Sequence, residues 1–230
     1  MLLSFLTFNN EIVACRRCPR LVEHCRGVAE VKRRAWRDWD YWGKPVPPFG
    51  DRRAELLIIG LAPGAHGANR TGRMFTGDRS GDFLFRALHD TGFASQAESR
   101  SRDDGLRLDN AYITAAVRCA PPDNKPAPEE MRACRRFLER ELDFLKRVRV
   151  VVALGRVAFG VYLSILRDRG LIATCGAFEF AHDREHPMPQ GLPRLISSYH
   201  PSQQNTSTGR LTLPMLTSVF RHARLLFLNP

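Results

Sequence analysis

The chain has no run of eighteen apolar residues, no internal repeat and no low-complexity linker. The first absence excludes a membrane-spanning helix, and the other two argue against a repeat array. The apolar start, residues 1–15, lacks a basic n-region and a small-residue cleavage site, so it is read as a short helix and not as a signal peptide. With 230 residues, we expect a single domain over residues 1–230, with an N-terminal helical segment over residues 1–45.

Cysteine is scarce, and four of the six cysteines fall into two pairs. Cys15 and Cys18 form a C-x-x-C motif, and Cys119 and Cys134 form a second pair about a hundred residues further on. Disulfides would require a secreted protein, usually a smaller one, so a reducing cytoplasm is favoured. Four thiolates in two groups are typical ligands of an Fe–S cluster or of a structural zinc ion, and their spacing leaves both possibilities open.

Acidic residues are outnumbered, with 24 against 35 lysines and arginines, and the net charge is +11. A basic surface favours polyanions such as DNA, RNA or anionic lipid. The sequence has no basic amphipathic helix with a strong apolar face, so lipid is the weaker of these choices. Composition therefore favours nucleic acid as the partner.

Short apolar runs alternate with helical patterns along the chain. We predict buried strands over residues 55–60, 111–114, 148–155 and 194–198, and helices over residues 81–91, 128–147, 156–167 and 214–228. This alternation predicts an α/β fold in which helices cover both faces of a central, mainly parallel four-stranded sheet. Ligands of such sheets bind beyond the carboxyl ends of the strands.

The loop after the first strand, residues 60–78, carries several unusual residues. It is neither a Walker loop nor a G-x-G-x-x-G motif, although its glycines allow close backbone approach to a ligand. Phe75 near a carboxylate suits a planar ligand stacked on the ring. Asp78 is predicted either to orient a water molecule or to cap the helix that starts near Gly81, where Ser80 could also serve as the cap.

The loop after the last strand reads Tyr-His-Pro-Ser-Gln-Gln-Asn over residues 199–205. The strand brings His200 to the same sheet edge, and Pro201 sets the turn that follows. The polar, uncharged residues after it suit contacts in a DNA groove or in the gap left by a flipped base. Cys119 follows the second strand closely, so a metal bound there would anchor a loop of the pocket.

These motifs together resemble the iron–sulfur uracil-DNA glycosylases, in particular family 5. The resemblance runs from Cys15-x-x-Cys18-Pro19 to the helix after Arg210, and it is carried by GLAPGAHGANRTGR-x-FTGD (residues 60–78) and YHPS-x-QN-x-x-TGRLT (residues 199–212). It implies a three-layer α/β/α uracil-DNA glycosylase-like fold. It also implies removal of uracil and other deaminated bases, hypoxanthine among them, from DNA in a prokaryotic, nucleoid-associated cytoplasmic setting by a monomeric enzyme.

The resemblance also implies roles for individual residues. It implies a [4Fe–4S] cluster on Cys15, Cys18, Cys119 and Cys134, stacking of the flipped base on Phe75, and catalytic roles for Asp78 and His200. The residues expected at the base are Gly60, Ala62, Gly64, Phe75, Ala115 and Asn124. Those expected at the rest of the DNA are Arg70, Arg73, Ser202, Gln203, Gln204 and Asn205.

Two departures from the sister family 4 bear on specificity. That family has a uracil-reading Asn where this chain has Ala115, and a Glu where it has Leu61, which argues for a broad substrate range. The alternatives are a non-catalytic, metal-stabilised DNA-binding module and a phosphoesterase using the histidine. The second lacks a carboxylate cluster for a catalytic metal.

Overall fold

The computed structural model describes residues 3–228, and its centre is a mixed sheet with strand order β1-β3-β2-β4-β6-β5. Four neighbouring strands are parallel and form the middle of the sheet: β3 (Ala111–Ala115), β2 (Leu56–Gly60), β4 (Val150–Leu154) and β6 (Arg194–Ser198). The edge strands β1 (Phe49–Gly50) and β5 (Arg184–His186) are antiparallel to their neighbours. The four predicted strands are present, but the predicted four-stranded sheet is wrong in strand number because two short edge strands extend it.

The parallel strands are apolar throughout because both faces of the sheet are covered. Leu56 and Ile58 of β2 belong to one apolar cluster, whereas Leu57 and Ile59 belong to another, as expected when successive side chains point to opposite faces. The first cluster includes buried residues of α4 (Arg79–Asp90) and α8 (Leu213–Leu228). The second includes residues of α5 (Pro128–Phe144) and α6 (Arg156–Asp168).

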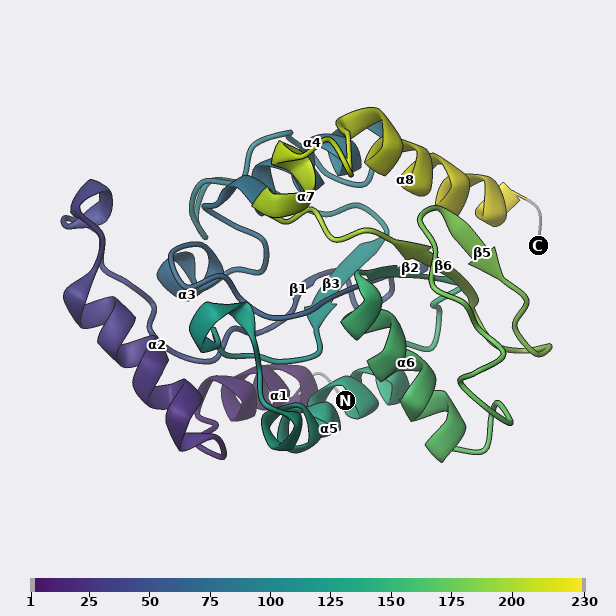
Figure 1. Ribbon diagram of the computed structural model, residues 1–230, viewed down its shortest axis with the longest axis horizontal. Helices are drawn as coiled ribbons and strands as arrows, with labels where there is room; N and C mark the ends of the chain where they lie inside the picture. Colours follow the sequence, from purple (N-terminus) through teal and green to yellow (C-terminus); the bar gives the residue numbers. More distant parts are fainter. Residues whose placement is uncertain (1–2, 229–230) are drawn as a thin grey trace.

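The helices therefore form two layers around the sheet. Figure 1 shows α4 and α8 above the sheet in that view, and α5 and α6 below it. This is the predicted three-layer α/β/α arrangement. In the part of the chain that the structure describes, no helix is both long and apolar enough to cross a membrane.

The N-terminal segment packs on α5 and on the loop after β3. It contains α1 (Leu3–Val13), α2 (Pro19–Val31) and the short 3₁₀ helix η1 (Arg34–Trp36). Phe8, Ile12 and Leu21 share a buried cluster with Phe137 of α5 and with Cys119. The rings of Phe8 and Phe137 pack edge to face, with their centroids 6.1 Å apart. Apolar contacts therefore join this segment to the rest of the chain.

The loops at the carboxyl ends of the parallel strands contain three short helices. These are α3 (Ala68–Thr71) after β2, η2 (Pro122–Asn124) after β3 and α7 (Gln203–Ser207) after β6. In Figure 1 these elements lie on the same side of the sheet. The topology thus brings the unusual loops of the sequence to one edge.

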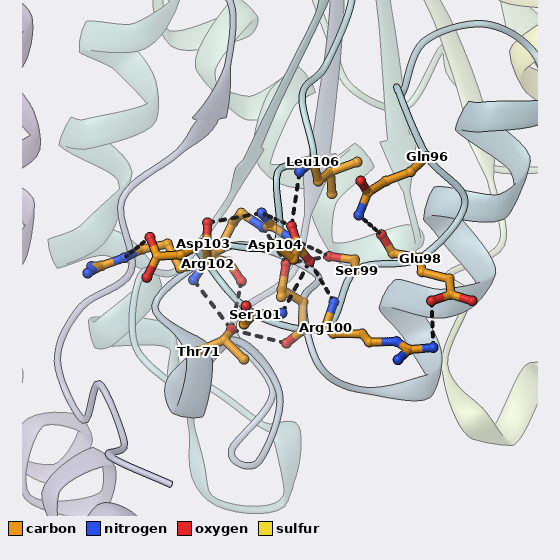
Figure 2. A network of polar contacts seen from close by, with 12 residues as sticks. Thr71, Gln96, Glu98, Ser99, Arg100, Ser101, Arg102, Asp103, Asp104 and Leu106 are labelled. Carbon is orange, nitrogen blue, oxygen red and sulfur yellow. Dashed lines mark hydrogen bonds and ion pairs between the residues drawn. The ribbon is translucent and has the colours of Figure 1, made fainter.

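A buried ion pair ties the loop after β2 to residues 96–106. The guanidinium of Arg73 donates to both carboxylate oxygens of Asp104, at 2.9 and 2.8 Å, and the side chains are 4% and 13% exposed. Asp104 also accepts from the backbone N–H groups of Arg100, Ser101 and Leu106, as Figure 2 shows. Burial raises the pKa of Asp104, but these hydrogen bonds outweigh it and hold the pKa at about 2.

The Asp104→Asn variant is expected to lose about 2–4 kcal/mol of stability at pH 7, because Arg73 stays buried without a carboxylate. The native pKa of about 2 lies below the ordinary value of 3.8. The pair therefore stabilises the wild type fully above pH 4, and this contribution disappears as the pH falls towards 2. Urea unfolding across this pH range measures both effects. Asp103→Asn, at an 89% exposed neighbour, is the control and should unfold like the wild type.

Candidate active site at the carboxyl edge of the sheet

Phe75 is held in an uncommon backbone conformation beside the end of β2. Its φ is +52°, in the left-handed region that non-glycine residues rarely adopt. Two glycines make room for it. A Cβ on Gly60 would lie 2.7 Å from Phe75 Cζ, and one on Gly81 would lie 1.9 Å from the Phe75 carbonyl oxygen. The ring is therefore placed against the sheet edge by neighbours that cannot carry a side chain.

Asp78 has a structural contact and a carboxylate oxygen directed into the glycine-rich loop. Its Oδ1 accepts from the backbone N–H of Gly81 at 2.9 Å, so it caps α4. Its Oδ2 lies close to Gly64 and Gly67, where added Cβ atoms would be 2.7 and 1.9 Å away. The predicted capping role is confirmed, and it leaves the second oxygen at the loop that follows β2.

Burial of the Asp78 carboxyl raises its pKa above the ordinary 3.8, and the nearby carboxylate of Asp82 acts in the same direction. The backbone N–H groups of Gly81 and Ser80 and the guanidinium of Arg70 oppose this rise. A partly desolvated carboxylate of this kind is a stronger base than one in water.

His200 lies at the end of β6 and faces Phe75. The two ring centroids are 5.8 Å apart with an interplanar angle of 33°. The adjacent Gly155, at the end of β4, would bring a Cβ within 3.2 Å of the His200 Cβ. Burial lowers the pKa of His200 to about 4, so the imidazole is neutral at physiological pH and can donate one hydrogen bond.

The structure thus brings together two of the three side chains at the centre of the predicted site and places the third in the same loop as Phe75. Phe75 and His200 face one another across the ends of β2 and β6, and Asp78 follows Phe75 by three residues in the same loop. A planar aromatic surface, a neutral donor and a buried carboxylate are suited to binding a flat heterocycle and activating water beside it.

The two arginines predicted to bind DNA are both buried. Arg73, 4% exposed, donates to Asp104 and to neighbouring hydroxyl and carbonyl groups, so it holds the loop in place. Its DNA contact stays a prediction. Arg70, 3% exposed, donates to the carbonyl oxygens of His66 and Gly77 at 2.8 and 2.6 Å. Arg70 is therefore also buried and does not lie on the surface. Its Nη1 has no hydrogen-bond partner within residues 3–228. A charged residue in a glycine-rich loop gives no sign of its burial in the sequence.

Some of the residues after His200 hold the loop in place, and others are exposed to solvent. Asn205 Nδ2 donates to the His200 carbonyl oxygen at 2.8 Å, so this amide nitrogen positions the loop. Ser202 caps α7 by accepting from the Asn205 N–H. Gln203 and Gln204 are exposed, and their DNA contacts stay predictions.

The smaller predicted base-binding residues line different parts of the edge. Ala115 is 1% exposed at the end of β3, opposite Gly60 in the register of the sheet. Ala62 packs against the cysteine-containing cluster. Asn124 is exposed on η2. Its base-binding role stays a prediction.

The four predicted metal ligands surround one small cavity. Cys15 and Cys18 line it from the turn between α1 and α2, Cys119 from the loop after β3 and Cys134 from α5. The backbone N–H of Arg118 donates to Cys134 Sγ at 3.3 Å. Within residues 3–228, no three His, Cys, Asp or Glu side chains are grouped closely enough to hold a single ion. The ligands of a cluster each bind a different iron, so they need not meet that condition.

Sequence reasoning overlooked two tryptophans near this edge. Trp36 and Trp39 lie over the guanidinium of Arg70, with its Cζ 4.4 and 4.1 Å from the ring centroids. Their segment, residues 33–39, interleaves arginine with tryptophan. That pattern is itself typical of nucleic-acid contacts and could have identified them.

Comparison with known proteins identifies the family of the chain. A family model described as the uracil DNA glycosylase superfamily matches residues 47–224. The match covers all parallel strands and the loops that carry Phe75, Asp78 and His200. The chain belongs to the uracil-DNA glycosylase superfamily.

Within that superfamily, the chain belongs with the type-5 proteins. It is 52% identical to the type-5 uracil-DNA glycosylase of Thermus thermophilus, over 94% of this chain and 95% of that protein. It is 49% identical to that of Mycobacterium bovis, over 96% of this chain and 81% of that protein. The type-4 uracil-DNA glycosylase of Thermotoga maritima is 32% identical over 53% of this chain and 58% of its own length.

The Gly67→Ala variant tests the placement of the Asp78 carboxylate. The new Cβ would overlap Asp78 Oδ2, so we expect the carboxylate to move and the single-turnover excision rate to fall at least tenfold. Gly27→Ala is the control, because a Cβ there meets nothing within 4 Å. If Gly67→Ala excised uracil at the wild-type rate while folded, the position of this oxygen would not matter for the reaction.

Proposed function

We propose that this protein is a DNA glycosylase of base-excision repair that removes uracil by hydrolysing the N-glycosidic bond and leaves an abasic site. The observation that carries the proposal is the facing pair of Phe75 and His200, 5.8 Å apart, with Asp78 in the same loop as Phe75. Membership of the uracil-DNA glycosylase superfamily supports it. The net charge of +11 suits a polyanionic substrate.

The target base must leave the duplex before it can react, at a cost of a few kcal/mol. Phe75 would offset part of this cost by stacking on the flipped base. Cleavage then builds positive charge on the sugar and negative charge on the departing base. The site must stabilise both charges without a covalent bond to the protein.

Asp78 and His200 divide this task. The carboxylate of Asp78 holds the attacking water, accepts its proton and stabilises the sugar cation. The neutral imidazole of His200 donates a hydrogen bond to the base oxygen as that oxygen becomes negative. A donor aimed at developing charge in a dry pocket supplies roughly 3 kcal/mol of transition-state stabilisation.

Other deaminated bases, hypoxanthine among them, are proposed as further substrates. An Asn at position 115 would test one base edge with a donor and an acceptor, whereas Ala115 offers no such test. Selection then depends on pocket shape, on stacking and on how easily a mispaired base flips.

A structural [4Fe–4S] cluster is proposed at Cys15, Cys18, Cys119 and Cys134. The shared cavity and the N–H group directed at Cys134 Sγ support this assignment. Four protein thiolates leave no open coordination position, so the group would join the N-terminal segment to the loop after β3 and to α5 without taking part in catalysis.

The Asp78→Asn variant should lose at least roughly a hundredfold in single-turnover excision while binding DNA normally, since Asn still caps α4. In the wild type the rate should fall on the acid side with a midpoint above 3.8, as Asp78 becomes protonated, and show no inflection near 6.5. The pKa of His200, about 4, keeps the imidazole neutral there. Asp90→Asn, at the other end of α4, is the control. Equal loss of binding and rate would instead mean that Asp78 has a structural role.

The Ala115→Asn variant should narrow the substrate range. Asn reads the uracil edge and rejects hypoxanthine, so the ratio of uracil to hypoxanthine excision should rise at least tenfold. A panel of oligonucleotides containing uracil, hypoxanthine, xanthine or a G·T mismatch measures it. An unchanged ratio in a folded variant would exclude this role for position 115.

The purified protein should be brown, absorb broadly in the visible range and contain iron. Cys134→Ser should lose the iron and lower the melting temperature, because a ligand of the cluster is removed. Cys175→Ser, outside the cysteine cavity, should keep both. A colourless wild type containing zinc would contradict the cluster assignment.

A further inference from the structure

A groove with a cavity volume of about 730 Å³ opens beside the proposed active site. It lies between η1, the exposed side of α4 and residues 97–100. We propose that this groove, here called the flank groove, binds one or two unpaired nucleotides next to the flipped one, on the same DNA strand. This inference rests on the proposed function and adds a second subsite to it. The lining residues used below are Trp36, Trp39, Arg70, Gly77, Arg79, Phe83 and Arg86.

Aromatic rings supply the stacking surface of the flank groove. Trp36 and Trp39 line one side, and Phe83 of α4 lines the other. The two tryptophans are fixed before any ligand binds, because the Arg70 guanidinium packs on both rings at 4.4 and 4.1 Å. Unpaired bases stack on such rings with little regard to sequence.

Unpaired positive charge lies on the opposite wall. Arg79 and Arg86 are exposed and seven residues apart on α4, so they share one face of the helix. Among residues 3–228 neither forms an ion pair, whereas Arg100 is paired with Glu98 at 2.6 Å. Asp82 lies between the two arginines and lowers the net charge of this wall. The remaining charge favours a chain of phosphates over an acidic side chain or a neutral peptide.

One residue that lines the same groove has a buried donor without a partner. Arg70 is 3% exposed and lines the groove, and its Nε and Nη2 are bonded to backbone carbonyl oxygens. Its Nη1 has no hydrogen-bond partner among the described residues. A buried donor of this kind is costly unless a ligand oxygen completes it. Phosphate and base oxygens are suitable acceptors.

The groove adjoins the loop that carries Asp78. Gly77 and Arg79, which line it, are the neighbours of Asp78 on either side. In this proposal, the strand that presents its flipped base to Phe75 and Asp78 continues into the groove past Gly77 and Arg79. Bases in a duplex are already stacked on one another, so the partly exposed rings favour an unpaired flank.

The test measures binding of an undamaged fluorescein-labelled oligothymidylate of eight nucleotides by anisotropy. Trp39→Ala should weaken binding by about 5- to 150-fold, the effect of losing one base–aromatic stack. The double variant Arg79→Ala with Arg86→Ala should make the slope of log K against log salt less steep by about 1.4, since each phosphate contact to a single strand contributes about 0.7. Arg147→Ala, exposed just before β4 at the far edge of the sheet, is the matched control and should bind like the wild type.

Excision of uracil from single-stranded oligonucleotides provides the second measurement. The groove variants should raise KM with little change in kcat. This effect should vanish with an oligonucleotide that has no nucleotides on one side of the uracil. Wild-type binding and an unaltered salt slope in both groove variants would overturn the subsite, and would leave the face open to a protein partner. If oligothymidylate binding falls as expected but the wild type excises nothing, the groove stands and the proposed function fails.

Discussion

The bidentate pair between Arg73 and Asp104 is the contact on which the geometry of the site depends. Arg73 lies two residues before Phe75, and Asp104 accepts hydrogen bonds from the backbone N–H groups of residues 100, 101 and 106. One buried carboxylate thus fixes the loop that carries Phe75 and Asp78 and the segment that forms a wall of the flank groove. Because both side chains are desolvated, removing either one would leave the other as an unpaired buried charge and destabilise the protein.

Space for the site comes from missing side chains as much as from those present. Gly60 and Gly81 leave room for the ring and carbonyl group of Phe75, while Gly64 and Gly67 leave room for the carboxylate of Asp78. The parallel strands supply a rigid edge on which these loops are built. Desolvation then moves the pKa of Asp78 upward and that of His200 downward, so burial alone prepares a base and a neutral donor for physiological pH.

Continuous apolar runs in the sequence predicted the central strands and the helices that cover them. The loops at the strand ends predicted that Phe75 and His200 would meet. The edge strands β1 and β5 could not be predicted, since Phe-Gly and Arg-Glu-His carry no apolar pattern and depend on neighbours for pairing. The burial of Arg73 could not be predicted for a related reason. Its partner Asp104 is remote in sequence, and only the folded chain brings them together. The groove likewise combines distant segments.

The N-terminal helices find their packing partners far along the chain. Phe8 and Leu21 are buried against Cys119 and Phe137, and the segment that follows them carries the tryptophans over Arg70. On the ribosome, residues 3–31 are therefore made well before α5 and have no complete docking surface until α5 has been synthesised. Their apolar faces remain uncovered while the intervening residues 32–127 are synthesised, which makes this segment a place where nascent chains would engage a chaperone.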